Sequence, residues 1–274
     1  MAKKAAILIP GLPRWYEHTI ESLRENVIES NPEFEFDIFL SLWNATNDRK
    51  DRENSLTFLD KAYIDQVIET YNPKSHIIMN YEKMEKKFSD INYPKYEKYI
   101  KDIEHEVYKG KDFCLHALFM QFWGCLKAGE LLERHYENYD VVIKWRYDLL
   151  AKSPLQLNKF VEHENYDSSI FGIANNHHGI VDFMFVGNQE NMKIPMNVFN
   201  FVNNLEYGGP KAEIESFTDT DDTILKRYKT TIPEYIWFEY IQKCNKKIVP
   251  IPVEWNLHGS LVNSHGNDRH PHTF

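Results

Sequence analysis

Short apolar runs alternate with stretches of helical spacing over the first 80 residues. Ala5–Ile9 is apolar throughout, which is typical of a strand buried on both faces of a parallel sheet. Tyr16–Ser30 follows with apolar residues at helical spacing, and Phe36–Trp43 is the next apolar run. Leu56–Tyr71 predicts a second helix and Ser75–Asn80 a third strand. This order of strands and helices predicts an α/β fold.

The middle of the chain first breaks this alternation and then resumes it. Tyr81–Lys111 is rich in Lys, Glu and Tyr, which predicts a charged insertion, either a solvated surface segment or a lid. Phe113–Tyr136 predicts a long helix whose first half is apolar nearly all round and therefore buried. Val141–Ile143 predicts a central strand, and the polar segment Lys144–Asp148 follows it directly. Open α/β sheets bind ligands at such carboxyl ends of their strands.

The second half predicts further strands and helices, without a repeat or a dividing linker. The strands are expected at Ser169–Ala174, Val181–Val186 and Ile248–Val253, and the helices at Asn188–Phe201 and Pro233–Lys243. The last strand is expected at a sheet edge, because Pro250 and Pro252 cannot donate to a neighbouring strand. Asn203–Thr223 is an acidic connection rich in Gly and Pro, and the tail from residue 263 is polar.

Composition excludes several classes of protein. A net charge of −9 over 274 residues argues against a general nucleic-acid binder, which needs a basic surface. Cys114, Cys125 and Cys244 form no CxxC pair, so neither a disulfide scaffold nor a zinc ribbon is expected. No window approaches the ~18 apolar residues of a membrane span, and the first apolar run is too short for a signal peptide. We therefore expect a soluble, cytoplasmic protein.

The common nucleotide and hydrolase motifs GxGxxG, GxxxxGK[ST], HExxH and GxSxG are absent. The first candidate site is therefore the turn that begins with Pro10 and Gly11. Gly11 lets the backbone approach a ligand closely, and Arg14 can form a forked contact with a phosphate. The alternative is a plain turn with a surface arginine.

Two acidic residues give further candidates. Asp148 can bind a divalent cation that bridges a diphosphate, while Arg146 can meet the diphosphate directly; the alternative is a surface ion pair. Asp182 stands alone in an apolar run, which is costly unless it is paired or functional. It is either a base that deprotonates an acceptor hydroxyl or a cap at the start of a strand. Of the histidines, only His258 is placed to return to such a site as a metal or phosphate ligand.

Several of these segments together resemble a known family. They are Pro10-Gly11-Leu12-Pro13-Arg14, Phe36–Trp43, Gln121-Phe122, Tyr139–Leu149 and Asp182–Gly187. The combination resembles the GT-A type glycosyltransferases found in large DNA viruses, phages and marine microbes. Their pattern is an opening G-x-P-R loop, a strand ending in D-x-F-x-x-x-W, a Y-D-x-V-I-x-x-R-x-D strand and a later D-x-x-x-x-G segment.

The resemblance implies a nucleotide-sugar donor, most simply a UDP- or GDP-sugar. Arg146 and Asp148 would occupy the place of the family's metal-binding D-x-D motif. Arg146 stands where the first acidic residue would be, which leaves a requirement for Mn²⁺ or Mg²⁺ open. Lys144 stands in place of the commoner arginine. The residues expected at the donor are Pro10, Gly11, Arg14, Trp43, Lys144, Arg146, Tyr147 and Asp148, with Asp148 and His258 as metal ligands.

Sugar transfer then needs two contributions from the protein. The charge of the departing nucleoside diphosphate must be stabilised. We assign this task to Arg14, to Arg146, to Asp148 through a cation, and to His258. The acceptor hydroxyl must be oriented and deprotonated. The candidates for that base are Asp182, Glu239 and Glu234. Trp43, Trp145 and Tyr147 are candidates for stacking on a base or a sugar.

The predicted fold class is α/β, GT-A-like (Rossmann-like nucleotide-binding), with a mixed, mostly parallel central sheet flanked by helices. We expect one domain over residues 1–262, with a donor-binding half at 1–150 that carries the insertion 81–111, an acceptor-binding half at 151–262, and a tail at 263–274. The acceptor is a glycan or another hydroxyl compound, and the location is the cytoplasm, or the host cytoplasm if the protein is viral. Two other functions stay open: a non-catalytic carbohydrate- or protein-binding module, and a sugar nucleotidyltransferase.

Overall fold

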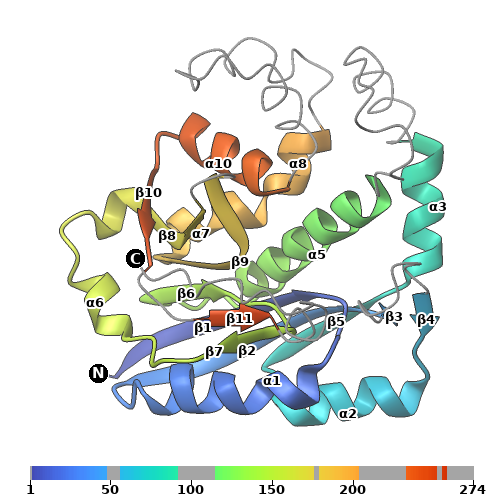
Figure 1. Cartoon of the computed structure of the whole chain (residues 1–274), viewed down its shortest axis with the longest axis horizontal. Coiled ribbons are helices and arrows are strands. Elements are labelled where there is room, and N and C mark those ends of the chain that lie inside the picture. The colour runs from blue at the N-terminus through green and yellow to red at the C-terminus, as the bar shows by residue number, and fades with distance from the viewer. Residues whose placement is uncertain are drawn as a thin grey trace, which may run out of the picture.

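The computed structural model describes residues 2–47, 56–91, 115–175, 179–203, 233–251 and 255–257. Within these residues the core is one seven-stranded sheet with helices packed on both of its faces (Figure 1). Its strands are β1 (Lys3–Gly11), β2 (Phe34–Trp43), β5 (Ser75–Met79), β6 (Val141–Lys144), β8 (Ser169–Asn175), β9 (Gly179–Gly187) and β10 (Lys247–Pro250). Two short antiparallel pairs stand apart from it, β3 (Ala45–Asn47) with β4 (Leu56–Phe58) and β7 (Leu149–Ala151) with β11 (Trp255–Leu257).

The strand order across the large sheet is β10-β8-β9-β6-β1-β2-β5. Neighbouring strands run parallel except at β9, which is antiparallel to both β6 and β8. The predicted class is therefore confirmed: an α/β fold with a mixed, mostly parallel central sheet flanked by helices. β10 lies at the edge of the sheet, as Pro250 required.

The helices form two layers on opposite faces of the sheet (Figure 1). One layer contains α1 (Tyr16–Leu23), which continues as a π-helical segment over Arg24–Glu29, and α2 (Lys61–Tyr71). The other contains α3 (Tyr81–Ile91), α5 (Leu115–Arg134), α7 (Gln189–Met196), α8 (Val198–Asn203) and α10 (Pro233–Lys243). α6 (Leu157–Val161) and a 3₁₀ turn at Tyr166–Ser168 connect β7 to β8.

The first strand shows why a continuous apolar run is needed. Ala5, Ile7 and Ile9 pack in the core beneath α1 and α2, whereas Ala6 and Leu8 pack in the core beneath α5. Successive side chains of a strand point to opposite faces, so a strand covered on both faces must be apolar at every position.

Two predicted helices differ in detail from the observed ones. The range predicted as one helix from Leu56 begins instead with β4, and α2 starts only after Asp60. The Asp60 carboxylate accepts a hydrogen bond from the Tyr63 backbone N–H at 2.8 Å, which caps the helix there. The helix predicted over Asn188–Phe201 is divided into α7 and α8 at Asn197.

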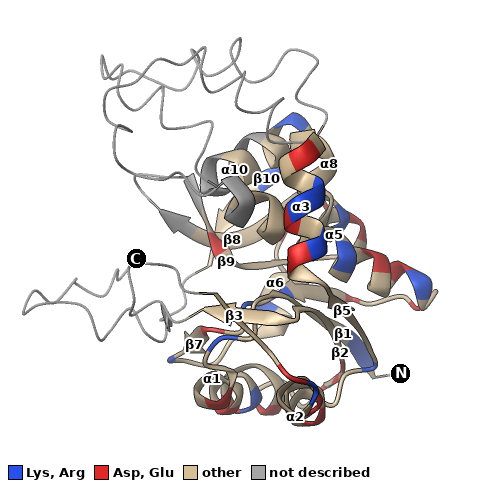
Figure 2. Cartoon of the chain, turned by 90° about the vertical axis from the view of Figure 1, so that its right-hand side faces the viewer, with Lys and Arg blue, Asp and Glu red and all other residues tan. Residues whose placement is uncertain are grey.

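The predicted charged insertion is helical in its described part. α3 carries Lys and Glu along its length, as Figure 2 shows, while Tyr81 and Phe88 are buried. The rest of the insertion, the connection predicted over Asn203–Thr223 and the polar tail lie outside the described residues. Within the described part of the chain, none of the helices has the length and apolar character of a membrane span.

Candidate functional site

The candidate site lies where the order of the sheet reverses. From β1 the chain adds β2 and β5 on one side, and β6 on the other side. β1 and β6 are parallel neighbours, so their carboxyl ends meet at one edge of the sheet. Arg14 follows β1, and Arg146 and Asp148 follow β6. Ligands of open α/β sheets bind outside the strands at such a reversal.

The turn after β6 joins Arg146 to Asp148. The Leu149 backbone N–H donates to the Arg146 carbonyl at 3.2 Å, which closes the turn. Arg146 Nε donates to Asp148 Oδ1 and Arg146 Nη2 to Asp148 Oδ2, both at 2.9 Å. The contact is therefore a two-point fork between a guanidinium and a carboxylate, which fixes both planes.

Asp182 approaches the same guanidinium from the other side. Arg146 Nη1 donates to Asp182 Oδ1 at 3.2 Å and to Asp182 Oδ2 at 3.0 Å. Gln121 of α5 donates to Asp182 Oδ2 as well. Asp182 reaches this edge because β9 is antiparallel, so the beginning of β9, not its end, lies beside the carboxyl end of β6.

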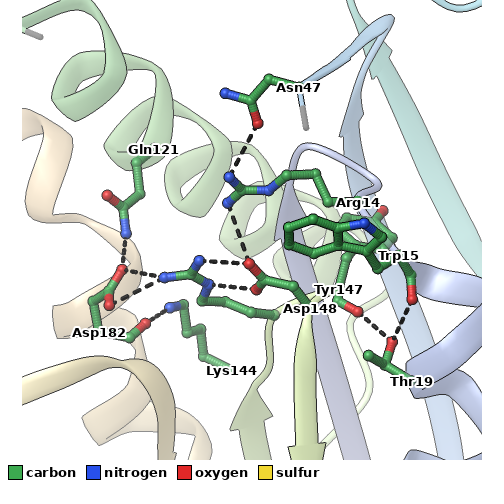
Figure 3. Close-up of polar contacts among 10 residues, drawn as sticks. Arg14, Trp15, Thr19, Asn47, Gln121, Lys144, Tyr147, Asp148 and Asp182 are labelled. Atoms are coloured by element: carbon green, nitrogen blue, oxygen red, sulfur yellow. Dashed lines mark hydrogen bonds and ion pairs between the residues drawn. The ribbon is translucent and has the colours of Figure 1, made fainter. Parts of the chain in front are cut away.

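Arg14 completes a row of alternating charges (Figure 3). Its Nη2 lies 3.3 Å from Asp148 Oδ2, and its Nη1 donates to Asn47 Oδ1 of β3 at 3.0 Å. We call Arg14, Asp148, Arg146 and Asp182 the charge row. The side-chain exposures along it are 15%, 2%, 11% and 5%, so Arg14 is its most accessible member. The predicted convergence of both arginines on Asp148 is thus observed.

Lys144 does not lie open at this edge, contrary to its predicted place at the nucleotide. Its side chain is buried, and its Nζ donates to the Asp182 carbonyl oxygen. The ammonium lies 5.4 Å from the Phe185 ring centre and 5.1 Å from that of Trp237. Burial lowers the pKa of Lys144. Lys144 therefore ties β6 to β9 from within the core.

The three aromatic residues predicted to stack on a ligand are also buried. Trp145 and Tyr147 pack in the core beneath α1 and α2, and Trp43 packs in the opposite core, 5.7 Å from the Tyr81 ring. Their role is corrected to core packing, because side chains alternate along the chain and these positions face the helix layers. Trp15 is only partly buried and lies in the close-up beside Arg14.

Three residues of this edge received no site role from the sequence. Gln121 belongs to the segments that resemble the family, and it is the only polar side chain between Ala117 and Leu126, but no contact was predicted for it. Asn47 left no signal, because its contact with Arg14 depends on the fold. Trp15 has a positive φ of 48° at the start of α1, a conformation rare for a bulky side chain.

Pro10 and Gly11 belong to β1 itself, so the strand runs two residues further than predicted. Gly11 has a φ of 128°, and a Cβ atom added there would meet nothing within 4 Å. On the side of β1 that faces α5 the packing is close, since a Cβ atom added to Gly124 of α5 would lie 3.5 Å from the Pro10 Cβ and 3.6 Å from the Gly11 backbone nitrogen. The space where a Gly11 side chain would stand is open, and contact of a ligand with the Gly11 backbone stays a prediction.

The residues of the charge row do not fit a divalent metal ion as they are arranged. Both oxygens of Asp148 accept hydrogen bonds from Arg146, and Arg14 lies against Oδ2. Among the described side chains, no three His, Cys, Asp or Glu residues gather as a metal site. The side chains of Glu234 and Glu239 on α10, and all of His258, lie outside the described part of the structure, so their roles stay predictions.

Comparison with known proteins assigns the chain to no family. No family model matches the chain, and no curated protein sequence does. Among solved structures, the apo-form glycosyltransferase GlyE of Streptococcus pneumoniae TIGR4 is similar with a TM-score of 0.40 and 9% identity over 91% of this chain. A second GlyE structure has a TM-score of 0.37 and 9% identity over 92% of this chain. The chain spans 45% of the length of each GlyE chain. Similarity at this level leaves the function to the chemistry of the site.

Proposed function

We propose that this chain is a GT-A type glycosyltransferase that moves a sugar from a nucleotide-sugar donor to a hydroxyl acceptor. The observation that carries the proposal is the charge row at the reversal of the strand order. Arg14 and Arg146 converge there on Asp148, and Arg14 is the most exposed of the four side chains. A guanidinium that is fixed in place and partly exposed suits a diphosphate, and the sequence resemblance supplies the sugar-transfer chemistry.

Arg14 is the residue that we assign to the donor diphosphate. It is the most exposed member of the charge row, and its guanidinium is oriented by Asp148 and Asn47. When the bond between the sugar and the diphosphate breaks, negative charge grows on the leaving phosphate. A guanidinium already held in place stabilises that charge without reorganising.

Arg146 and Asp182 are assigned supporting roles in the same step. Arg146 is held between two carboxylates and keeps Asp148 in position for Arg14. Asp182 accepts hydrogen bonds on both oxygens, which favours an orienting role over the predicted role as base. Glu234 and Glu239 are then our candidates for the base that deprotonates the acceptor hydroxyl.

The proposal is tested with a panel of UDP-, GDP-, dTDP- and CMP-sugars. We expect one of them to raise the melting temperature, because a ligand that binds only the folded state stabilises it. The same compound should release free sugar slowly to water. Release of pyrophosphate from a sugar phosphate and a nucleoside triphosphate would instead indicate a nucleotidyltransferase. Failure of every compound, with and without manganese, would contradict the proposal.

Arg14→Gln provides the residue-level test, and Arg134→Gln is the matched control. Arg134 is exposed at the end of α5 and pairs only loosely with Glu130, at 3.5 Å. Loss of the charge of Arg14 should weaken donor binding by about tenfold or more, which corresponds to ~1.4 kcal/mol. Equal donor affinity for the two variants would remove Arg14 from the donor site.

A further inference from the structure

The guanidinium of Arg146 occupies the interval between the two buried carboxylates of the site. Asp148 binds its Nε and Nη2 edge, and Asp182 binds Nη1. A cation shared by both carboxylates would have to displace this guanidinium. Arg146 is itself buried among these partners and lies over the Phe183 ring, 4.8 Å from its centre. The Arg146 guanidinium therefore fills the space that a shared metal ion would need.

The outer side of Asp148 is covered as well. Its side chain is 2% exposed, and Arg14 Nη2 lies 3.3 Å from Oδ2. A Mg²⁺ ion needs near-octahedral oxygen ligands at about 2.1 Å, so a metal on this oxygen would have to move Arg14 aside. It would also place two positive charges next to two arginines in a buried site, where repulsion is weakly screened.

The row already supplies both carboxylates with organic cations. Asp148 and Asp182 contribute two negative charges, Arg14 and Arg146 contribute two positive ones, and the buried Lys144 ammonium lies against the Asp182 carbonyl oxygen. Arg14, the most exposed member, can contact an incoming diphosphate while Asp148 keeps its two-point contact with Arg146. A site in which Asp148 served only as a metal ligand would not need two guanidinium partners on that one carboxylate.

From this we infer that the donor diphosphate binds to the Arg14 guanidinium without a divalent cation, and that Asp148 is a positioning residue for Arg14. This inference rests on the proposed function, because it concerns how the same site holds its donor. It replaces the predicted role of Asp148 as a metal ligand.

The first experiment measures the affinity of the wild-type chain for UDP and for GDP by calorimetry. Each titration is done with excess EDTA, with Mn²⁺ and with Mg²⁺. We expect dissociation constants that agree within about twofold among the three conditions for the nucleotide that binds. An affinity that rises about tenfold or more with either metal would overturn the inference and leave the proposed function standing. No binding of either nucleotide in any condition would overturn the inference for UDP- and GDP-sugars, while the panel of sugar nucleotides tests the proposed function separately.

The second experiment compares Asp148→Asn with Asp65→Asn, an exposed aspartate that pairs with Lys61 on α2. A metal ligand and a positioning residue make different predictions for Asp148→Asn. If Asp148 held a metal, affinity for UDP or GDP would fall about tenfold or more only when Mn²⁺ or Mg²⁺ is present. As a positioning residue, its loss should change that affinity by the same factor with excess EDTA and with either metal, while the melting temperature falls below that of Asp65→Asn. A loss of affinity that appears only with a metal present would overturn the inference.

Discussion

Two groups of charged residues lie at opposite edges of the same sheet. The charge row lies at the carboxyl edge. At the other edge, Lys4, Asp37, Lys74 and Glu137 form what we call the amino-edge cluster. Lys4 pairs with Glu137 at 2.8 Å and Lys74 with Asp37 at 2.7 Å, and Lys74 also contacts Glu137. In both groups positive and negative side chains alternate, so the two groups differ in their environment and not in the type of interaction.

Exposure separates the two groups. Side chains of the amino-edge cluster are between 27% and 42% exposed, whereas those of the charge row are between 2% and 15% exposed. Water screens exposed pairs, so their measured contributions are about 0–1 kcal/mol each. Removing one partner of a buried pair leaves an uncompensated charge in a poorly solvated place. Of these two groups, the charge row is the one that holds its charges at a desolvation cost, which supports its proposed role as the donor site.

The largest effect is expected for Arg146→Ala. This change leaves Asp148 and Asp182 buried without their shared counter-charge, so the free energy of unfolding should fall by about 3–5 kcal/mol. Lys74→Ala at the opposite edge should cost no more than ~1 kcal/mol. Denaturation with urea, monitored by circular dichroism, measures both. Similar losses for the two variants would show that burial does not distinguish the two edges.

A smaller effect on stability is expected when the pH is lowered, because Glu137 of the amino-edge cluster then becomes protonated. Hydrogen bonds from Lys4 and Lys74 lower the pKa of Glu137 to about 2, against an ordinary value of 4.5. The folded state therefore holds the carboxylate charged more strongly than the unfolded chain does. This contribution to stability is present above the ordinary pKa and is lost as the pH falls toward about 2.

Melting temperatures of the wild-type chain and Glu137→Gln test this pH dependence. The advantage of the wild-type chain should be constant near neutral pH and should shrink as the pH falls through the interval between the two pKa values. Added salt should reduce the advantage as well, because the pairs are exposed. A difference between the two chains that is independent of pH would mean that the Glu137 charge does not matter.

Much of the fold could be predicted from the sequence because burial on both faces leaves a simple pattern. The apolar runs Ala5–Ile9 and Val141–Ile143 predicted strands of a sheet that is covered on both faces. The carboxyl ends of parallel neighbouring strands lie at the same edge of a sheet. That reasoning placed Arg14, Arg146 and Asp148 together, as observed. These positions follow from local pattern and chain direction alone.

The rest depended on packing that the pattern does not contain. Asp182 was a candidate because it stands alone in an apolar run, but its place beside Arg146 depends on β9 running antiparallel, and an apolar run does not reveal its direction. Lys144 and Tyr147 were expected at the ligand because they are polar or aromatic beside Arg146. Whether such a side chain faces an open edge or a helix layer is decided by the helices that cover each face, and both are buried.

The smallest effect is expected for Tyr147→Phe, although Tyr147 is next in sequence to Arg146, where the largest effect is expected. Tyr147 lies between Arg146 and Asp148 in sequence, but its ring packs in the core beneath α1 and α2, 5.6 Å from the Tyr71 ring. Its hydroxyl is buried and has no hydrogen-bond partner among the described residues, and burial raises the pKa of Tyr147 well above its ordinary value. Tyr147→Phe removes this polar atom and keeps the ring.

The free energy of unfolding of Tyr147→Phe should therefore stay equal or rise by up to about 1 kcal/mol, since a buried polar group without a partner is destabilising. The same urea denaturation measures it, and donor affinity should not change. A loss of about 1 kcal/mol or more would show that the hydroxyl forms a hydrogen bond in solution. Tyr147 and Arg146 are adjacent in the same turn. If the free energy of unfolding rises in Tyr147→Phe and falls in Arg146→Ala, the loss of stability at the carboxyl edge comes from the charges and not from the turn that carries them.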